Sequence, residues 1–265
     1  MRIEERFPRP SVMGVINVTP DSFSDGGVHF DPDAAANAAR RMRDEGAAIV
    51  DVGGESTRPG SDGVTLDEEL RRVLPVLERL QGEVPVSIDT AKAEVARRAL
   101  ELGAELVNDV TALRGDPDLA GVVADGGAYV CLMHMQGEPR TMQRDPQYDD
   151  VVSDVASFLE ERLRAAVDAG IPEERICLDP GIGFGKSVAH NLELIRRLDT
   201  LAALGRPVLI GISRKSTLRA LTGSEDLVAA SVGAAVAAFE RGATILRVHD
   251  VKPHVDALAV AGAFA

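Results

Sequence analysis

Eight short apolar runs recur along the whole chain, and an amphipathic stretch separates each run from the next. The runs are almost continuously apolar rather than alternating, which is typical of parallel strands covered on both faces. They fall at residues 12–16, 48–52, 84–88, 106–107, 129–133, 175–178, 208–212 and 244–248. Eight such strand–helix units predict a closed (β/α)8 TIM barrel, because a doubly wound open sheet, the alternative, has no reason to supply eight.

The ends of the expected helices carry their own signals. A Gly-Ala pair ends four amphipathic stretches and leads directly into an apolar run, and glycine suits the left-handed position after a helix. These pairs begin at Gly46, Gly103, Gly127 and Gly242, and Gly205 takes the same place before the seventh run. Asp31-Pro32 and Asp116-Pro117 each predict an N-cap followed by a first-turn proline. Thr65 and Glu68 predict a capping box.

No linker or low-complexity segment divides the chain, so residues 1–265 are expected to form a single domain. The chain carries 29 Lys and Arg against 42 Asp and Glu, a formal net charge of −13. No basic cluster of five or more occurs, which argues against nucleic-acid binding because phosphate contacts need clustered Lys and Arg. No apolar run approaches the roughly 20 residues of a membrane span. We therefore expect small-molecule substrates, with neither a nucleic-acid nor a membrane partner.

The cellular compartment is indicated by the start of the chain and by the two cysteines. The first residues, Met-Arg-Ile-Glu-Glu-Arg, are not followed by the apolar core of a secretory signal. Cys131 and Cys177 lie inside apolar runs, where buried thiols in a reducing compartment are favoured over a disulfide or a metal site. We expect a cytoplasmic protein.

Polar side chains stand at the ends of several expected strands. Asp89, Asn108 and Asp179 follow the third, fourth and sixth apolar runs. In a barrel the carboxyl ends of the strands form one face, which is where the active site lies. Buried carboxylates need partners. One interpretation is an internal network with Lys215 and Arg247. The other is a flat heterocycle whose N–H groups pair with a carboxylate in the bidentate way that guanidinium does.

Basic and polar residues near the first, second and eighth runs predict an anion site. The first and eighth strands are neighbours in a closed barrel, so these residues converge, and two guanidiniums with a histidine fit a di- or triphosphate. The residues are Asn17, Thr57, Arg58, Arg247 and His249. Solvated surface charge is the alternative for the basic residues, which also include Lys186 and Arg214, and helix capping is the alternative for His249. His134 is expected to have a structural role.

Two loops, residues 19–27 and 53–60, combine many small residues with Asp21, Arg58 and Pro59. Such loops are typical of lids that order over a substrate and exclude water, although plain surface loops are the alternative. A P-loop is excluded, because Pro180 stands where the first glycine of that motif is required. The five histidines show no ligand spacing for a metal-dependent hydrolase, and no structural zinc site is expected.

At these same residues the chain resembles the dihydropteroate synthases of the folate pathway. The matching motifs occur in order and span nearly the whole sequence. They are MGVINVTPDSFSDGG (13–27), DVGGESTRPG (51–60), SIDT (87–90), NDV (108–110), MHMQG (133–137), LDPGIGFGK (178–186), SRKS (213–216) and RVHD (247–250). The resemblance implies a transferase that condenses 6-hydroxymethyl-7,8-dihydropterin pyrophosphate with 4-aminobenzoate, giving 7,8-dihydropteroate and pyrophosphate.

The resemblance also implies a role for each matching residue. The pterin would be held by Asp89, Asn108, Asp179 and Lys215, with Met133 nearby and Arg247 stacked on the ring. Asn17 would contact Mg²⁺ with the pyrophosphate, whose oxygens would meet Thr57, Arg58, Arg247 and His249. The aminobenzoate site would consist of Phe184, Pro59, Lys215 and Ser216. Asp21 would stabilise the cation that develops as pyrophosphate leaves, which makes Asp21, Arg58, Lys215, Arg247 and His249 the expected catalytic residues.

Two competing functions share parts of this pattern. A pterin-binding methyltransferase barrel would share the Asp/Asn clamp, but it has no need for the SRKS motif or for Arg58 with His249. A non-catalytic relative that only binds pterin would be expected to lose Asp21, Arg58 or Lys215, and all three are present. The resemblance further implies a homodimer and sulfonamide inhibition. The apolar stretches 228–239 and 257–264 are candidate dimer surfaces, although packing onto the barrel explains them equally well.

Overall fold

The computed structural model describes residues 1–19, 31–57, 60–138 and 140–264. Within these ranges eight parallel strands close into a barrel in chain order, and β8 pairs with β1. The strands are β1 (Ser11–Asn17), β2 (Ile49–Gly53), β3 (Val86–Asp89), β4 (Leu106–Asp109), β5 (Tyr129–Met133), β6 (Ile176–Asp179), β7 (Val208–Ile210) and β8 (Ala243–Val248). The predicted (β/α)8 barrel is therefore confirmed, and the open-sheet alternative is wrong.

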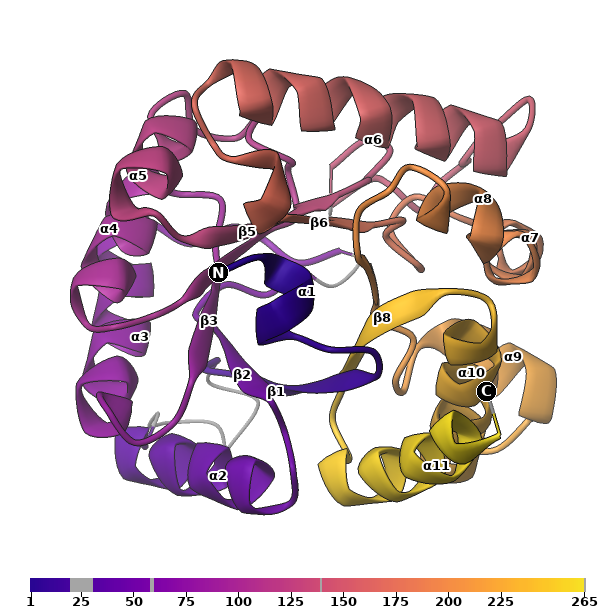
Figure 1. Cartoon of the computed structure of the whole chain (residues 1–265), viewed down its shortest axis with the longest axis horizontal. Coiled ribbons are helices and arrows are strands. Elements are labelled where there is room, and N and C mark those ends of the chain that lie inside the picture. The colour runs from indigo at the N-terminus through magenta and orange to yellow at the C-terminus, as the bar shows by residue number, and fades with distance from the viewer. Residues whose placement is uncertain (20–30, 58–59, 139, 265) are drawn as a thin grey trace.

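Helices surround the barrel and alternate with its strands (Figure 1). They are α1 (Ile3–Arg6), α2 (Pro32–Asp44), α3 (Leu66–Leu80), α4 (Ala93–Glu101), α5 (Leu119–Gly126), α6 (Val151–Asp168), η1 (Glu173–Arg175), α7 (Val188–Arg196), α8 (Leu198–Ala202), α9 (Ser216–Thr222), α10 (Val228–Glu240) and α11 (Val251–Ala263). No described helix is both long enough and apolar enough to cross a membrane.

The predicted strand positions hold to within about two residues, and the largest differences have local causes. β7 ends at Ile210 rather than at residue 212, and its pairing with β8 shifts register between Val208 and Leu209. β4 continues through Asn108 and Asp109, because the ladder to β5 pairs them with Cys131 and Leu132. Apolar character alone could not show that polar residues remain part of a strand.

The helix-end signals are mostly confirmed. The Asp31 carboxylate caps α2 by accepting from the backbone N–H groups of Asp33 and Ala34. Thr65 caps α3, but Glu68 pairs with Arg71 and Arg72 instead of completing the capping box. The glycines predicted after helices all have positive φ angles, namely Gly46, Gly103, Gly127, Gly205 and Gly242.

One expected helix start is wrong. The sequence Asp116-Pro117 predicts that a helix begins there, whereas α5 begins at Leu119. The Asp116 carboxylate accepts from the backbone N–H groups of Ala93 and Asp118. It therefore connects the start of α4 to this turn, because one oxygen makes a local bond and the other accepts from a residue distant in sequence.

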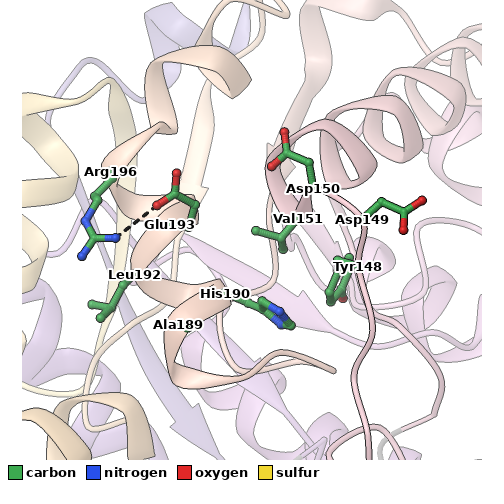
Figure 2. A pocket seen from close by; sticks show the side chains of 9 residues that line it. All are labelled: Tyr148, Asp149, Asp150, Val151, Ala189, His190, Leu192, Glu193 and Arg196. Carbon is green, nitrogen blue, oxygen red and sulfur yellow. Dashed lines mark hydrogen bonds and ion pairs between the residues drawn. The ribbon is translucent and has the colours of Figure 1, made fainter.

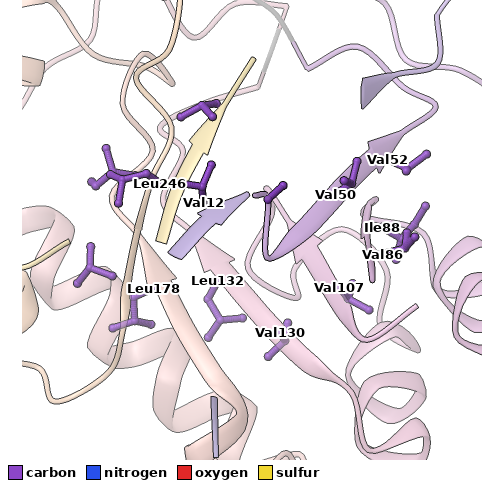
Figure 3. Close-up of a cluster of buried hydrophobic side chains, with 14 of the residues drawn as sticks. Val12, Val50, Val52, Val86, Ile88, Val107, Val130, Leu132, Leu178 and Leu246 are labelled. Atoms are coloured by element: carbon purple, nitrogen blue, oxygen red, sulfur yellow. The ribbon is translucent and has the colours of Figure 1, made fainter. Parts of the chain in front are cut away.

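Alternate residues of each strand face opposite sides of the barrel wall. One set packs outward under the helices and forms the large core between the two layers (Figure 3). It includes Val50 and Val52 of β2, Val107 of β4 and Leu132 of β5. The helices meet this layer with small or branched residues, such as Ala35 of α2.

The other set faces the barrel interior, which is divided along the barrel axis. Its amino-terminal end is an apolar cluster that we call the floor, made of Ile3, Phe7, Met13, Ile49, Leu106, Tyr129, Cys131, Cys177, Leu209 and Ile245. Ile3 and Phe7 come from α1 and the residue after it, and α1 lies near the centre of the ring in Figure 1. Cys131 and Cys177 are buried free thiols, as the sequence predicts. The opposite end of the interior is polar.

Candidate active site at the carboxyl end of the barrel

Polar side chains from neighbouring strands form the carboxyl end of the interior, which we call the mouth. Asp89 at the end of β3 is the register partner of Asn108 in β4. Asp179, the last residue of β6, is the register partner of Met133 at the end of β5. All four side chains are buried. The structure therefore brings the predicted heterocycle-binding residues onto one face, as the carboxyl ends of barrel strands require.

Arg247 of β8 connects opposite parts of the mouth. Its Nε donates to Asp51 Oδ2 at 2.6 Å, and a terminal guanidinium nitrogen donates to Asp89 Oδ2 at 2.8 Å. The side-chain nitrogen of Asn108 donates to the same Asp51 oxygen at 2.9 Å. The internal network that was the alternative interpretation therefore forms around Arg247.

Asp51 is a mouth residue to which the sequence assigned no role, although it stands near the end of an apolar run as the other mouth residues do. Its side chain is fully buried, and its Oδ1 has no hydrogen-bond partner among the described residues. Because a carboxylate only accepts hydrogen bonds, Asp51 fixes the orientation of the Asn108 amide, whose NH₂ group points towards Asp51. Asp51 can be seen in the sequence as a charge inside the apolar run of β2. One sequence does not show which buried charges pair with one another.

The mouth holds more negative than positive charge, and this shifts the pKa values of its side chains. Burial and the nearby Asp51 raise the pKa of Asp89 to about 8, against the opposing effect of Arg247. Burial disfavours the charged guanidinium of Arg247, yet Asp51 and Asp89 raise its pKa above the ordinary value. Burial and the like charge of Asp51 outweigh the guanidinium and favour a proton on Asp89.

Asp179 and Lys215 form the second half of the mouth. The Asp179 carboxylate accepts from the backbone N–H of Gly181 at 2.7 Å, and burial raises its pKa. Lys215 donates to the carbonyl of Ile182, and burial lowers its pKa to about 8 although Asp179 opposes this. Among the described ion pairs within 4 Å, those of the mouth join Arg247 to Asp51 and Asp89, and none joins Lys215 to Asp179. The internal network therefore does not extend to Lys215.

An apolar and aromatic edge lies beside Lys215. Its ammonium lies 4.6 Å from the centre of the Phe184 ring, a cation–π contact. Phe184 packs against a cluster of Val110, Met133, Met135 and Met142. Ser216 begins α9 directly after Lys215 and is exposed. The structure therefore places Phe184 beside Lys215, and Ser216 next to it in the chain.

The predicted anion-site residues lie on adjacent parts of the rim. Asn17 ends β1, which pairs with both β2 and β8. Thr57 lies in the loop after β2, and His249 follows β8 directly. The Nδ1 of His249 lies 3.1 Å from the hydroxyl oxygen of Ser213, so His249 contacts the segment after β7. α11 begins with Asp250 as its N-cap, which does not support the capping interpretation of His249.

Some sequence-based candidates are not described by the structure, and one described candidate lies outside the mouth. Asp21, Arg58 and Pro59 fall outside the described residues, and so do most of the first proposed lid and part of the second. Arg214 donates to Asp250 from its Nε and from one terminal nitrogen, and its side chain is half exposed. Among the described residues no three His, Cys, Asp or Glu side chains are grouped to hold a metal ion.

A separate surface cavity of about 400 Å³ lies outside the mouth, between the start of α6 and α7. Tyr148 and His190 line one end of it with their rings in edge-to-face contact, 5.0 Å between centres, and Asp150 and Glu193 lie on its two sides (Figure 2). Tyr148 also donates from its hydroxyl to the carbonyl of Gly185 at 2.7 Å. The cavity therefore adjoins the back of the loop that carries Phe184.

Comparisons with known proteins agree with this geometry. Residues 13–249 match the family described as pterin binding enzyme. The chain is 47% identical over 255 residues to the dihydropteroate synthase of Escherichia coli K12, covering 95% of this chain and 90% of that protein. It is 51% identical to a solved Xanthomonas albilineans dihydropteroate synthase with 4-aminobenzoic acid, with a TM-score of 0.91 and coverage of 97% and 94%. A second structure from that organism, in complex with 7,8-dihydropteroate, is 49% identical, with a TM-score of 0.88 and the same coverage.

The closed barrel and the family match together define the class of this chain, which is a pterin-binding enzyme. Both the family match and the identity to relatives extend over most of the chain. The chain therefore belongs to the pterin-binding enzyme family and, within it, to the dihydropteroate synthases, which are transferases.

Proposed function

We propose that this protein condenses 6-hydroxymethyl-7,8-dihydropterin pyrophosphate with 4-aminobenzoate, giving 7,8-dihydropteroate and pyrophosphate. The observation that carries the proposal is the position of Arg247. Its guanidinium bonds to Asp51 and Asp89 in the heterocycle clamp, while its strand pairs with β1, which ends at Asn17. One residue would therefore adjoin both the site proposed for a flat ring and the site proposed for its diphosphate.

The pterin would bind edge-on to Asp89, Asn108, Asp179 and Lys215. A carboxylate accepts two parallel N–H bonds from an aminopyrimidine edge as it does from guanidinium. Since Asp51 holds the NH₂ of Asn108 at 2.9 Å, the amide oxygen is the part of Asn108 left to meet a ligand N–H group. Met133 would pack near the ring.

The diphosphate would bind at the rim near Asn17, Thr57, Arg58, Arg247 and His249. Mg²⁺ prefers a few protein oxygens together with phosphate oxygens and water, and the single amide oxygen of Asn17 fits that donor set. When bound there, Mg²⁺ would neutralise part of the charge on the leaving diphosphate. Arg58, Arg247 and His249 would neutralise more of that charge through charge-assisted hydrogen bonds.

The 4-aminobenzoate would bind between Phe184 and Pro59, with Lys215 and Ser216 near its carboxylate. The ammonium of Lys215 lies over the Phe184 ring at 4.6 Å, so one apolar face and one cation are available together. An aromatic carboxylate needs both of these groups. We expect sulfonamides, which share this shape, to compete for the site.

The reaction would proceed by departure and then attack. The bond between the exocyclic carbon and oxygen breaks, and its electron pair leaves with the diphosphate. The electron-rich dihydropterin stabilises the cation, with Asp21 adding electrostatic stabilisation. The aminobenzoate nitrogen then bonds to the carbon and loses a proton, so no protein nucleophile is needed. If an Asp21→Ala protein bound both substrates and kept full turnover, this role of Asp21 would be wrong.

The first test is pyrophosphate release by purified protein with the pterin pyrophosphate and Mg²⁺, with and without 4-aminobenzoate. We expect dihydropteroate to form only when 4-aminobenzoate is present. The matched control is Arg206→Met, which alters a partly buried cation at the amino-terminal face, where it bonds to Glu4 and to the carbonyl of Glu173. Pterin binding by folded protein without release or product would overturn the proposal in favour of a non-catalytic relative.

We also propose a homodimer in the cytoplasm. Val260 and Phe264 at the end of the chain are 58% and 86% exposed, and buried apolar contacts are what a stable dimer requires. The two free thiols fit a reducing compartment. Light scattering would give the mass, and a monomer at micromolar concentration would overturn the dimer.

A further inference from the structure

Lys186 is a buried cation that the proposed chemistry does not use. Its residue is 3% exposed. Its ammonium donates to the carbonyl of Phe184 at 2.9 Å and to the carbonyl of His134 at 3.4 Å, and it lies 2.9 Å from Nδ1 of His134. In the described part of the chain none of these hydrogen-bond partners is a carboxylate. A buried ammonium held mainly by neutral acceptors is costly, so it calls for a reason beyond packing.

The partner histidine suits this arrangement. Burial lowers the pKa of Lys186 to about 7, although Asp179 opposes this. In its charged form the ammonium only donates, so Nδ1 of His134 then accepts from a neutral ring with its proton on Nε2. Burial, together with Lys186, lowers the pKa of His134 to about 3, in agreement with a neutral ring. The ring also packs edge-on against Phe158, with ring centres 4.8 Å apart. His134 is therefore a fixed acceptor, the structural role expected from the sequence.

The loop after β6 contacts the loop after β5 through its backbone. A Cβ added to Gly181 would lie 1.9 Å from the carbonyl oxygen of His134, and one added to Gly185 would lie 2.4 Å from that of Gln136. Both glycines also have positive φ angles, of 68° and 64°. Only glycine permits this approach, so the two loops form one unit that Lys186 joins from within.

This unit presents groups to the aminobenzoate side of the mouth. The Ile182 carbonyl accepts from Lys215, and the Phe184 ring lies under the same ammonium. The backbone N–H of Gly183 donates to Asn191 at 2.9 Å, and Asn191 donates to Thr217 of α9 at 2.9 Å. The loop therefore contacts Lys215 directly and also connects to the helix that begins at Ser216.

We propose that Lys186 is a positioning residue that holds the loop after β6 against His134 and thereby orients Phe184 and Lys215 for 4-aminobenzoate. Lys186 itself does not contact substrate. The proposal rests on the proposed function, because it names the subsite whose geometry Lys186 sets. Tyr148, whose hydroxyl donates to the Gly185 carbonyl, supports the same loop from outside.

The test compares the KM values of the two substrates. In Lys186→Met we expect the KM for 4-aminobenzoate to rise about tenfold and the KM for the pterin pyrophosphate to stay within about twofold, since a displaced loop misplaces one subsite. Tyr148→Phe should give a smaller rise of the same kind. It also keeps the test possible if Lys186→Met does not fold. Arg206→Met should change neither KM.

A double variant tests whether Lys186 acts through Phe184. In a Phe184→Leu background, we expect Lys186→Met to change the 4-aminobenzoate KM by less than about twofold, because coupled residues are not additive. Equal rises of both KM values in Lys186→Met, or full additivity with Phe184→Leu, would overturn the positioning role. Absence of dihydropteroate formation by the unaltered protein would instead overturn the proposed function.

Discussion

The two ends of the barrel interior are built from the same strands but obey different physical requirements. The floor holds apolar side chains such as Leu106 and Ile245, both fully buried. Two residues further along the same strands, the mouth holds Asn108 and Arg247. Because side chains alternate along a strand, each pair points to the same interior at different heights. The floor stabilises the fold, while the mouth concentrates charge that favours ligand binding over stability.

The largest difference in turnover between a mouth substitution and a floor substitution is expected in β8. Arg247→Met should lower turnover on the order of 10³-fold, because it removes a charge from the leaving-group site. It should also lower the free energy of unfolding by about 3–5 kcal/mol, since Asp51 and Asp89 lose their buried partner. Ile245→Ala should cost about 2–5 kcal/mol of stability while folded protein keeps its turnover. Urea unfolding and steady-state rates measure both, and equal turnover losses would contradict the division.

A second pair in β4 should show a smaller effect of the same kind. Asn108→Ala should lower turnover on the order of 10²-fold through loss of a ligand contact, yet change the free energy of unfolding by only about 1 kcal/mol. Leu106→Ala should do the reverse, costing about 2–5 kcal/mol through a cavity in the floor. The same two measurements apply. A stability loss in Asn108→Ala as large as that in Leu106→Ala would contradict the expectation that Asn108 serves ligand binding rather than the fold.

The charge of the mouth should make stability depend on pH. The pKa of Asp89 is raised from 3.8 to about 8 in the folded state, so the folded protein holds a proton that the unfolded chain has lost. Stability from this group is therefore fully present below about pH 4 and falls as pH rises to about 8. In the unaltered protein this group should lower the free energy of unfolding by up to about 1.4 kcal/mol for each pH unit, and Asp89→Asn should abolish that dependence. Chemical unfolding of both proteins between pH 5 and pH 8 measures the difference, and a constant difference would contradict it.

The smallest predicted effect locates the boundary between floor and mouth. Cys131 and Cys177 are register partners below Met133 and Asp179. We expect Cys177→Ala to cost about 1 kcal/mol, as removal of one small buried group does, with turnover unchanged. Neither thiol should react with a thiol reagent until urea unfolds the protein, because both are buried. Loss of turnover in Cys177→Ala would place the boundary lower in the barrel.

Sequence reasoning predicted the fold and most of the mouth because both depend on local patterns. Eight apolar runs specify eight covered strands, and closure into a barrel follows from their number. Asp89, Asn108 and Asp179 were found because a charge or amide stands at the end of each buried strand. Asp116 and Pro117 predict the start of α5 two residues too early, because local sequence does not show that the Asp116 carboxylate also bonds to Ala93 of α4.

The sequence by itself determined the order of the strands, the face on which polar residues lie and the family of the chain. Each of these depends on short contiguous stretches of residues. Only the tertiary structure decided which charges pair. Asp51 and Arg247 are 196 positions apart and meet only when β8 closes against β1. Lys186 finds His134, 52 positions away, only when two glycine-containing loops come into contact. Pairing energies depend on distance and burial, and neither is known until the chain has closed.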